Sequence, residues 1–560
     1  MARLMAGALA PLALLPLLAG CGRLSGPSLE ITMLVGSALG GFCKESAAAI
    51  ERDPPRLPDG TRVLLRCRAS GSGDVVSEME SHARAVLQGG GRADDPAIPT
   101  LVSVDGEIYQ ELLRHRLQAI APGRSLIPPS ADAPALATSP MVLMTTPALV
   151  KGLQRPQPFL AMARVDNHQQ LDPTGPPQPI RFVQTAPTRS NSGLQTLVAM
   201  VAEVSGKRPE QLTLTDVKAH AAAVAAIQKH VTRYGSSTDE LARTMQRNGV
   251  FWASVASVYE SSVVAANGRR EPGQEALVAV YPRATYSSTM RAILPTAPWV
   301  SAQERQAAML LIERLEQPAL QRIAADQGLR PANSAVPMSR ITAAYGADPR
   351  AVYDSLRAPS PEVVEAIITS WRNQVKKPSR VALVVDSSGS MKGDKLPSAQ
   401  RSLQAYLAQT GPRDVLGLID FDSSVGEPVV VRGGPADAAK AMTFVSGLRA
   451  EGGTSLYDAV EAGRNWLRRT RRPDEILAVV VLTDGNDSGS KLSLQALEAE
   501  LRRSGFASDD RIGVFTIGYG SSGEYNADAL RRIAESNGGV FVEGTPDSIL
   551  KRMEQLQLAF

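Results

Sequence analysis

Short apolar runs that stop abruptly at polar residues mark the last third of the chain. Residues 381–385 are consecutive apolar residues, and Asp386 and a serine-rich turn follow them directly. A Val-rich run of this length is too short to cross a membrane and is typical of a parallel strand covered on both faces. Residues 476–482 form a second such run, which ends in Thr483 and Asp484. The pattern predicts an open α/β sheet whose strands carry oxygen-bearing side chains at their carboxyl ends.

The rest of this C-terminal region alternates between predicted strands and helices. Strands are predicted at 380–386, 415–421, 428–432, 476–483, 512–518 and 539–543, with helices between most of them. The 428–432 strand follows a tight connection, so we expect it at the antiparallel edge of the sheet. Residues 379–560 are therefore predicted to form a doubly wound, mostly parallel, Rossmann-like domain.

Residues 29–335 also alternate between strands and helices. The pattern predicts strands at 29–37, 61–67 and 140–144, helices at 74–87, 107–117 and 194–204, and one long helix from Ser301 to near Gly328. Residues 336–378 form a connector in which Ser360 and Pro361 predict the start of a helix that runs to about residue 375. Because the next strand begins within a few residues, we expect a semi-rigid relation between the two regions.

Three oxygen-rich stretches meet at the predicted rim of the C-terminal sheet. They supply Asp386, Ser388 and Ser390 after the first strand, Thr454 in a Gly-Gly-Thr-Ser turn, and Asp484 after the second long strand. Carboxylates and hydroxyls of this kind suit a hard divalent cation. The alternative is that Asp and Ser cap the helices that follow, which would account for one such stretch but not for three.

Together these stretches resemble the metal-ion-dependent adhesion site (MIDAS) of the von Willebrand factor A (VWA) domain family. The resemblance implies that Ser388 and Ser390 bind the metal directly. It also implies that Thr454, Asp386 and Asp484 complete the coordination directly or through water. Mg²⁺ is the expected ion, with Mn²⁺ or Ca²⁺ as alternatives. A protein partner would then complete the coordination with an Asp or Glu carboxylate.

The region 29–335 carries a series of looser motifs. They are a serine after the first strand, a Ser-Gly-Ser-Gly turn, a Thr-Arg-Ser-Asn-Ser-Gly turn, a Tyr-Glu pair and a Gly-Leu-Arg-Pro ending. In this order they resemble bacterial extracellular solute-binding proteins of the two-lobed type II periplasmic fold. The resemblance implies a ligand between the lobes.

Hydroxyls and free N–H groups at helix starts suit an oxyanion or carboxylate. The candidate ligand-binding residues are Ser37, Ser72, Ser190, Asn191, Ser192 and Glu260. The alternative is that they cap helices and form turns in a domain that binds no small solute. Glu260 would repel an anion.

The amino terminus reads as a secretory signal over residues 1–20, with Arg3 before an apolar stretch. Its end, Leu-Ala-Gly-Cys, resembles the lipobox of bacterial lipoproteins, which implies acylation of Cys21. An ordinary signal peptide beside a cysteine is the alternative. Residues 21–28 are then a short tether. No later stretch approaches the length of a membrane span.

The cysteines fit an extracytoplasmic location. If Cys21 carries lipid, Cys43 and Cys67 remain as a pair in an oxidising compartment, and we expect a disulfide between them. The mature protein is predicted to be lipid-anchored on the periplasmic or cell-surface side of a membrane.

Composition and motifs exclude several function classes. The chain has 60 Lys and Arg against 56 Asp and Glu in mixed order, so nucleic acid is not an expected partner. Its scattered histidines (His82, His115, His168, His220, His230) offer no zinc or triad pattern, and an enzyme is not expected.

These observations leave two functional hypotheses. The first is a lipoprotein that binds protein partners through the metal site, with the solute-binding-like region sensing a ligand or acting as a scaffold. The second is the substrate-binding component of a solute transporter, for an oxyanion among other solutes, with an accessory VWA domain. A channel role, suggested by families with a similar C-terminal domain, conflicts with the absence of an apolar span.

Overall fold

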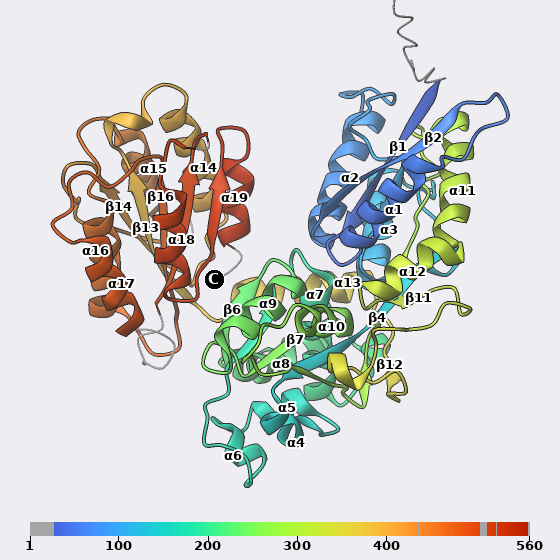
Figure 1. The fold of residues 1–560 in the computed structure, drawn as a ribbon, viewed down its shortest axis with the longest axis horizontal. Coiled ribbons are helices and arrows are strands. Elements are labelled where there is room, and N and C mark those ends of the chain that lie inside the picture. The colour runs from blue at the N-terminus through green and yellow to red at the C-terminus, as the bar shows by residue number, and fades with distance from the viewer. Residues whose placement is uncertain (1–26, 434–436, 504–511, 522, 558–559) are drawn as a thin grey trace, which may run out of the picture.

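The computed structural model describes residues 27–433, 437–503, 512–521, 523–557 and 560. Over these residues the chain folds into two lobes and a C-terminal domain, with lobe 2 between the other two (Figure 1). The predicted signal sequence and Cys21 lie outside the described residues. Among the helices that are described, none combines the length and the apolar character needed to cross a membrane.

Lobe 1 is built on a parallel sheet in the order β2-β1-β3. The strands are β1 (Ser28–Gly36), β2 (Arg62–Ser70) and β3 (Leu101–Ser103), and the helices of this lobe are α1 (Gly40–Arg52), α2 (Ser72–Leu87), α3 (Glu107–Ile120), α11 (Ala302–Glu316) and α12 (Pro318–Asp326). Cys43 of α1 and Cys67 of β2 form the expected disulfide, with their Cα atoms 5.9 Å apart. It fastens a helix to the sheet across 24 residues of chain.

Lobe 2 contains a mixed sheet in the order β10-β4-β7-β5-β6, to which β8 and β11 add by pairing with β4. Its strands are β4 (Ala135–Thr145), β5 (Phe182–Thr185), β6 (Val231–Gly235), β7 (Val255–Tyr259), β8 (Val278–Val280), β10 (Ser287–Arg291) and β11 (Arg330–Pro331). Its helices include α7 (Asn191–Ser205), α8 (Leu214–Gln228), α9 (Thr238–Asn248) and α10 (Glu260–Gly268). The long β4 joins the lobes, because Leu136 and Ala137 pack in the core of lobe 1 while Leu143 packs in that of lobe 2.

The predicted long helix after Ser301 is divided into α11 and α12. Ser301 caps α11 by accepting a hydrogen bond from Glu304 N. The division falls at Gln317, directly before Pro318, because proline cannot donate to a continuing helix and is favoured at a helix start.

The connector forms the predicted helix. Ser360 caps α13 (Pro361–Ser370), and a π-helical turn, Trp371–Val375, leads directly to the first strand of the C-terminal domain. Earlier in the connector, Ile341 and Ala347 pack against Val264 of lobe 2. The first part of the connector thus extends the core of lobe 2.

The C-terminal domain has a sheet in the order β15-β14-β13-β16-β17-β18. Its strands are β13 (Ser379–Asp386), β14 (Val415–Phe421), β15 (Val429–Arg432), β16 (Ile476–Thr483), β17 (Gly513–Tyr519) and β18 (Phe541–Gly544), and its helices are α14 (Lys395–Ala408), α15 (Ala438–Gly447), α16 (Leu456–Thr470), α17 (Leu494–Arg503), α18 (Ala527–Glu535) and α19 (Ile549–Gln557). β15 is the antiparallel edge strand, and the other pairings are parallel. The predicted fold class is confirmed.

Lobe 2 contacts the amino-terminal edge of this sheet. The guanidinium of Arg233 lies 4.7 Å from the ring centroid of Phe515 and 5.8 Å from that of Trp252, and it donates to the Gly538 carbonyl. A guanidinium that lies over aromatic rings and is partly shielded from water makes a favourable contact with them. The sheet's carboxyl-terminal edge, where the candidate metal ligands lie, therefore faces away from lobe 2 (Figure 1).

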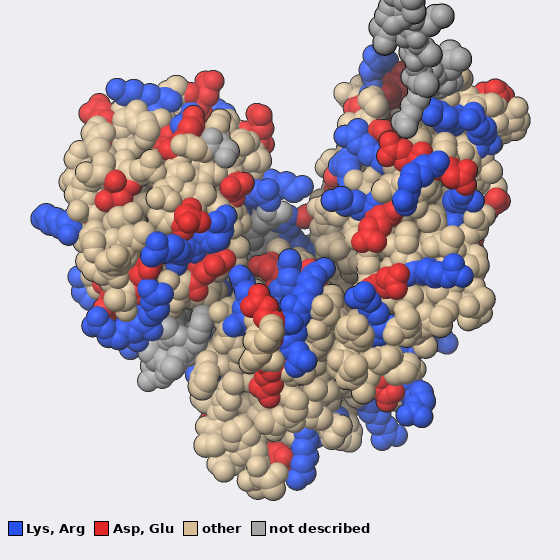
Figure 2. Space-filling view, in the orientation of Figure 1, with Lys and Arg blue, Asp and Glu red and all other residues tan. Residues whose placement is uncertain are grey.

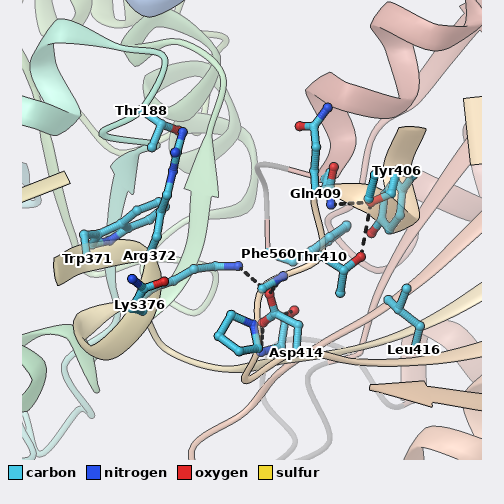
Figure 3. A pocket seen from close by; sticks show the side chains of 16 residues that line it. Thr188, Trp371, Arg372, Lys376, Tyr406, Gln409, Thr410, Asp414, Leu416 and Phe560 are labelled. Atoms are coloured by element: carbon cyan, nitrogen blue, oxygen red, sulfur yellow. Dashed lines mark hydrogen bonds and ion pairs between the residues drawn. The ribbon is translucent and has the colours of Figure 1, made fainter. Parts of the chain in front are cut away.

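The junction also contains an open pocket of about 500 Å³ between the connector and the C-terminal domain (Figure 3). Lys376 Nζ reaches across to Asp414 Oδ2 at 3.2 Å, and Tyr406 and Phe560 form part of the wall. On the face seen in Figure 2, acidic and basic residues are interspersed, and a hollow separates lobe 1 from the C-terminal domain.

Candidate functional site

Asp386 lies at the carboxyl end of β13 and is fully buried. Its Oδ1 accepts from Ser388 N at 2.8 Å, and its Oδ2 accepts from the Thr483 hydroxyl at 2.5 Å. The strand ends here because the apolar run stops, and the turn that follows is folded around the carboxylate. Asp386 is thus fixed from two neighbouring strands.

The predicted hydroxyl ligands form a chain beside it. Ser388 Oγ lies 2.9 Å from Ser390 Oγ, and the Ser390 hydroxyl donates to Asp484 Oδ1 at 2.7 Å. Thr454 is next to them, because a Cβ placed on Gly485 would lie 3.2 Å from Thr454 Oγ1 and 3.4 Å from Ser390 Oγ. Ser388, Ser390 and Asp484 are thus joined by hydrogen bonds, with Asp386 and Thr454 adjacent, at one rim.

Backbone contacts bring the turn before Thr454 to this rim. Gly389 N donates to Gly452 O at 3.1 Å, and Glu451 N donates to Ser387 O at 2.9 Å. Gly452 has φ +73°, a conformation that favours glycine. The nearby Asp422 is a turn residue, since its Oδ1 accepts from Ser424 N at 2.8 Å.

Lys395 is a member of the site that the sequence analysis missed. Its Nζ lies 2.7 Å from Asp484 Oδ2 and 3.0 Å from Glu524 Oε2. It is the first residue of α14, where the helix dipole disfavours a cation. A lysine in the first turn of a helix was the signal that a carboxylate partner lies nearby.

The electrostatics fit a cation at this rim. Burial raises the pKa of Asp386, with the proximity of Asp484 as a smaller cause in the same direction. A divalent cation would favour both ionised carboxylates, and the donor set is all oxygen. In the part of the chain that the structure describes, no cluster of three or more His, Cys, Asp or Glu residues is suited to a metal ion. The candidate site relies on hydroxyl oxygens instead, and an all-oxygen set of this kind suits a hard divalent cation.

The predicted solute ligands lie between the lobes and are mostly buried. Ser37 is exposed and lines a cavity of about 420 Å³ between α1 and the helices α9 and α10. Ser72, Ser190, Asn191 and Ser192 are buried at the starts of α2 and α7. Their side chains bond to the protein itself.

Three of these contacts are direct hydrogen bonds between side chains. Ser192 Oγ lies 2.7 Å from Thr185 Oγ1 and 2.9 Å from Ser190 Oγ. Asn191 Nδ2 donates to the Tyr259 hydroxyl at 3.0 Å. These contacts tie the start of α7 to β5 and β7, and Ser190 makes no capping hydrogen bond to the helix.

Glu260 is fully buried and paired. Both of its carboxylate oxygens accept from the Arg330 guanidinium at 2.8 Å, and the Tyr281 hydroxyl also donates to it. A bidentate pair of this kind is a strong charge-assisted contact. It ties α10 to β11, so the negative charge that seemed to oppose an anion is balanced within the protein.

Comparison with known proteins matches the two regions separately. Residues 126–351 match the family model described as bacterial extracellular solute-binding protein, and residues 381–486 match that of the von Willebrand factor type A domain. The human inter-alpha-trypsin inhibitor heavy chain H4 is 29% identical over 170 residues, which are 29% of this chain and 18% of that protein. The pig protein is 27% identical over 168 residues, with the same coverage. The chain thus spans about a fifth of the length of these relatives.

Among solved structures, a periplasmic thiamin-binding protein matches 62% of this chain and 96% of its own, with 14% identity and a TM-score of 0.41. A von Willebrand factor type A protein from Catenulispora acidiphila matches 33% of this chain and 43% of its own, with 16% identity and a TM-score of 0.29. The two family matches show that the chain consists of a bacterial extracellular solute-binding protein region joined to a C-terminal von Willebrand factor type A domain.

Proposed function

We propose that this protein is a membrane-anchored extracytoplasmic lipoprotein that captures protein partners through a divalent cation in its VWA domain. The observation that carries the proposal is the grouping of Asp386, Ser388, Ser390, Thr454 and Asp484 at the rim that faces away from lobe 2. Such a rim is open to a large partner, because the other end of the sheet is used for the contact with lobe 2.

The chemistry of the proposed capture is coordination. When bound, a divalent cation supplies an electrophilic position that the carboxylate of a partner's Asp or Glu completes. The side chains of this protein hold the remaining oxygens in place: Thr483 and Ser388 N orient Asp386, and Ser390 orients Asp484. Preorganised ligands lower the cost of binding both cation and partner.

The solute-binding region acts in this proposal as a scaffold between the membrane and the VWA domain. Membership of an extracellular solute-binding family supports an extracytoplasmic location. The anchor would be the lipid on Cys21. Fractionation of cells that express Cys21→Ser should recover the protein in soluble form, and a variant that stays with the membrane would contradict the lipid anchor.

Calorimetric titration of the full chain with Mg²⁺ and Mn²⁺ tests the metal site. Asp386→Ala should abolish binding, while Glu451→Ala should bind as the wild type does. Glu451 is a suitable control because its exposed carboxylate belongs to the same rim but not to the candidate ligands. A folded wild type without metal binding, or an Asp386→Ala variant that binds normally, would refute the proposal.

Capture of partners from membrane extracts should depend on the same residue. We expect proteins retained by the wild type with Mg²⁺ to be lost with chelator and with Asp386→Ala, and kept with Glu451→Ala. If the same proteins are retained with chelator and by Asp386→Ala, partner binding does not depend on the metal.

A second function, solute reception for a transporter, is favoured by the family match of residues 126–351 and by the 420 Å³ cavity that Ser37 lines. Adjacent permease genes and solute binding by the Asp386→Ala variant would support it.

A further inference from the structure

Asp105 lies between β3 and α3 and is 1% exposed. Its carboxylate faces the start of α1: Ala38 N donates to Oδ2 at 3.4 Å, and the Ser72 hydroxyl lies 3.3 Å from the same oxygen. Ser72 Oγ also accepts from Asp105 N at 3.1 Å. The N–H groups of a turn that leads into a helix favour the oxygens of a carboxyl group, and here that group is a side chain of the same chain.

The fold provides space for this carboxylate. A Cβ placed on Gly36 would lie 2.1 Å from Asp105 Oδ1, so glycine is required at the end of β1. Among the described residues, Asp105 Oδ1 has no hydrogen-bond partner although it is buried. A buried carboxylate oxygen without a partner is costly, so its position needs an explanation other than stability.

The two lobes contact each other directly around Asp105. Asn191 Nδ2 of lobe 2 donates to Asp105 O at 3.0 Å, and Gly73 N of lobe 1 donates to Arg189 O at 2.9 Å. The Tyr109 hydroxyl donates to Pro187 O at 2.8 Å. A Cβ on Gly73 would lie 2.1 Å from Thr188 O, so these described backbone segments leave no space for a solute between them.

A cation at the interlobe contact is also engaged within the protein. Arg189, in the turn before α7, pairs with Asp74 of lobe 1 at 2.5 Å. An arginine and a helix start are the two features that would bind an oxyanion at such a place. Each is satisfied by a carboxylate of lobe 1.

We propose that Asp105 occupies the anion position of the solute-binding region, so that the lobes are held closed without any solute. Asp105 then acts as a built-in ligand, and the region is a fixed support. The inference goes beyond the metal-dependent function and does not depend on it. It also restricts the transporter alternative, because an oxyanion cannot enter while Asp105 remains.

Removal of Asp105 should open a site for a small anion. We expect Asp105→Ala in the full chain to melt at a lower temperature than the wild type and to recover with formate, acetate, sulfate or phosphate. Calorimetry should show its affinity for at least one of these anions to be about tenfold or more above that of the wild type. Asp94→Ala, which removes an exposed carboxylate paired with Arg92 of the same lobe, should show no such gain.

Small-angle scattering of the wild type supplies a test that needs no variant. The scattering profile without added anion should match the closed lobes and should not change when sulfate or phosphate is added. The proposal is overturned if the wild type is open or closes on anion addition, or if it binds sulfate or phosphate as tightly as Asp105→Ala.

A folded Asp105→Ala variant that gains no affinity for these anions would also overturn the proposal. If Asp105→Ala does not fold, Asp105→Asn keeps the shape of the side chain without its charge. This variant should be closed and should bind none of the four anions, and anion binding by it would contradict the proposal.

Discussion

Lys395 Nζ lies 2.7 Å from Asp484 Oδ2, while the hydroxyl of Ser390 donates to the other oxygen of the same carboxylate. Asp484 is therefore shared between an ammonium ion of the protein and the ligand set proposed for the metal. The lysine balances part of the negative charge of Asp386 and Asp484 when no metal is bound. The ammonium group of Lys395 also lies beside the position that the metal ion would occupy.

Replacement of this lysine should strengthen metal binding. We expect Lys395→Met to raise the affinity for Mg²⁺ by about three- to tenfold, because a positive charge near the ion is removed. Without metal, the variant should be less stable by about 1–2 kcal/mol, since the buried carboxylate of Asp484 loses a charged partner. Calorimetric titration and melting with and without chelator measure the two effects.

Lys395→Arg is the matched control, because it keeps the charge and should leave the affinity for Mg²⁺ closer to that of the wild type. Weaker metal binding by Lys395→Met would show instead that the lysine is needed to orient Asp484.

The contact of Arg233 with Phe515 and Trp252 should couple the two regions. Arg233→Ala removes a partly buried cation that lies over two aromatic rings, together with a hydrogen bond to Gly538 O. We expect about 2–4 kcal/mol of lost stability at the junction and separate melting of the VWA domain in scanning calorimetry.

Arg247→Ala is the control for this prediction. Arg247 pairs with Glu535 across the same junction at 3.3 Å, but both side chains are about half exposed. Its loss should cost under about 1 kcal/mol and leave the melting profile unchanged. Equal effects of the two variants would argue against a central role for Arg233.

Stability should depend on pH through Asp105. Burial raises the pKa of this carboxyl from 3.8 to about 7. Between about pH 4 and pH 7 the folded protein keeps a proton that the unfolded chain releases, so the free energy of unfolding falls as the pH rises. Relative to Asp105→Asn, the wild type should lose up to about 4 kcal/mol over this window.

Denaturant unfolding of both proteins at several pH values measures this difference. The comparison with Asp105→Asn is needed because burial also raises the pKa of Glu203 to about 7. A constant difference between the two proteins from pH 4 to pH 8 would contradict the prediction.

The disulfide should stabilise lobe 1 by restricting the unfolded chain. Cys43 and Cys67 are separated by 24 residues, for which the loop-entropy estimate is about 3 kcal/mol. Reduction of the wild type should lower its melting temperature to that of a Cys43→Ser, Cys67→Ser variant. Two free thiols in the unreduced protein would reject the pairing.

The VWA domain could be predicted closely from the sequence because its elements are local. The strand ending in Asp386 and the edge strand β15 lie where the apolar runs predict them. Pro318, which divides the helix after Ser301, is itself a signal in the sequence for a new helix start. The position of Lys395 opposite Asp484 required tertiary contacts between residues 89 positions apart.

The residues between the lobes show why the roles of the predicted solute ligands could not be derived from the sequence. A serine or asparagine at a helix start accepts hydrogen bonds from a solute or from a neighbouring segment equally well. Asn191 contacts Tyr259 and Asp105, and Glu260 pairs with Arg330, 70 residues away. Only the packing of one lobe against the other distinguishes the two uses.

The arrangement of the three bodies determines from which direction a partner is reached. In Figure 1, β1 begins at the top of lobe 1, and the carboxyl ends of the VWA strands also point to the top of the view. If the proposed lipid anchor on Cys21 holds the chain just before β1, the rim that carries the candidate metal ligands would face the membrane of that anchor. Engagement would then take place in cis, with a protein of the same membrane, and not in trans with one on an opposing surface.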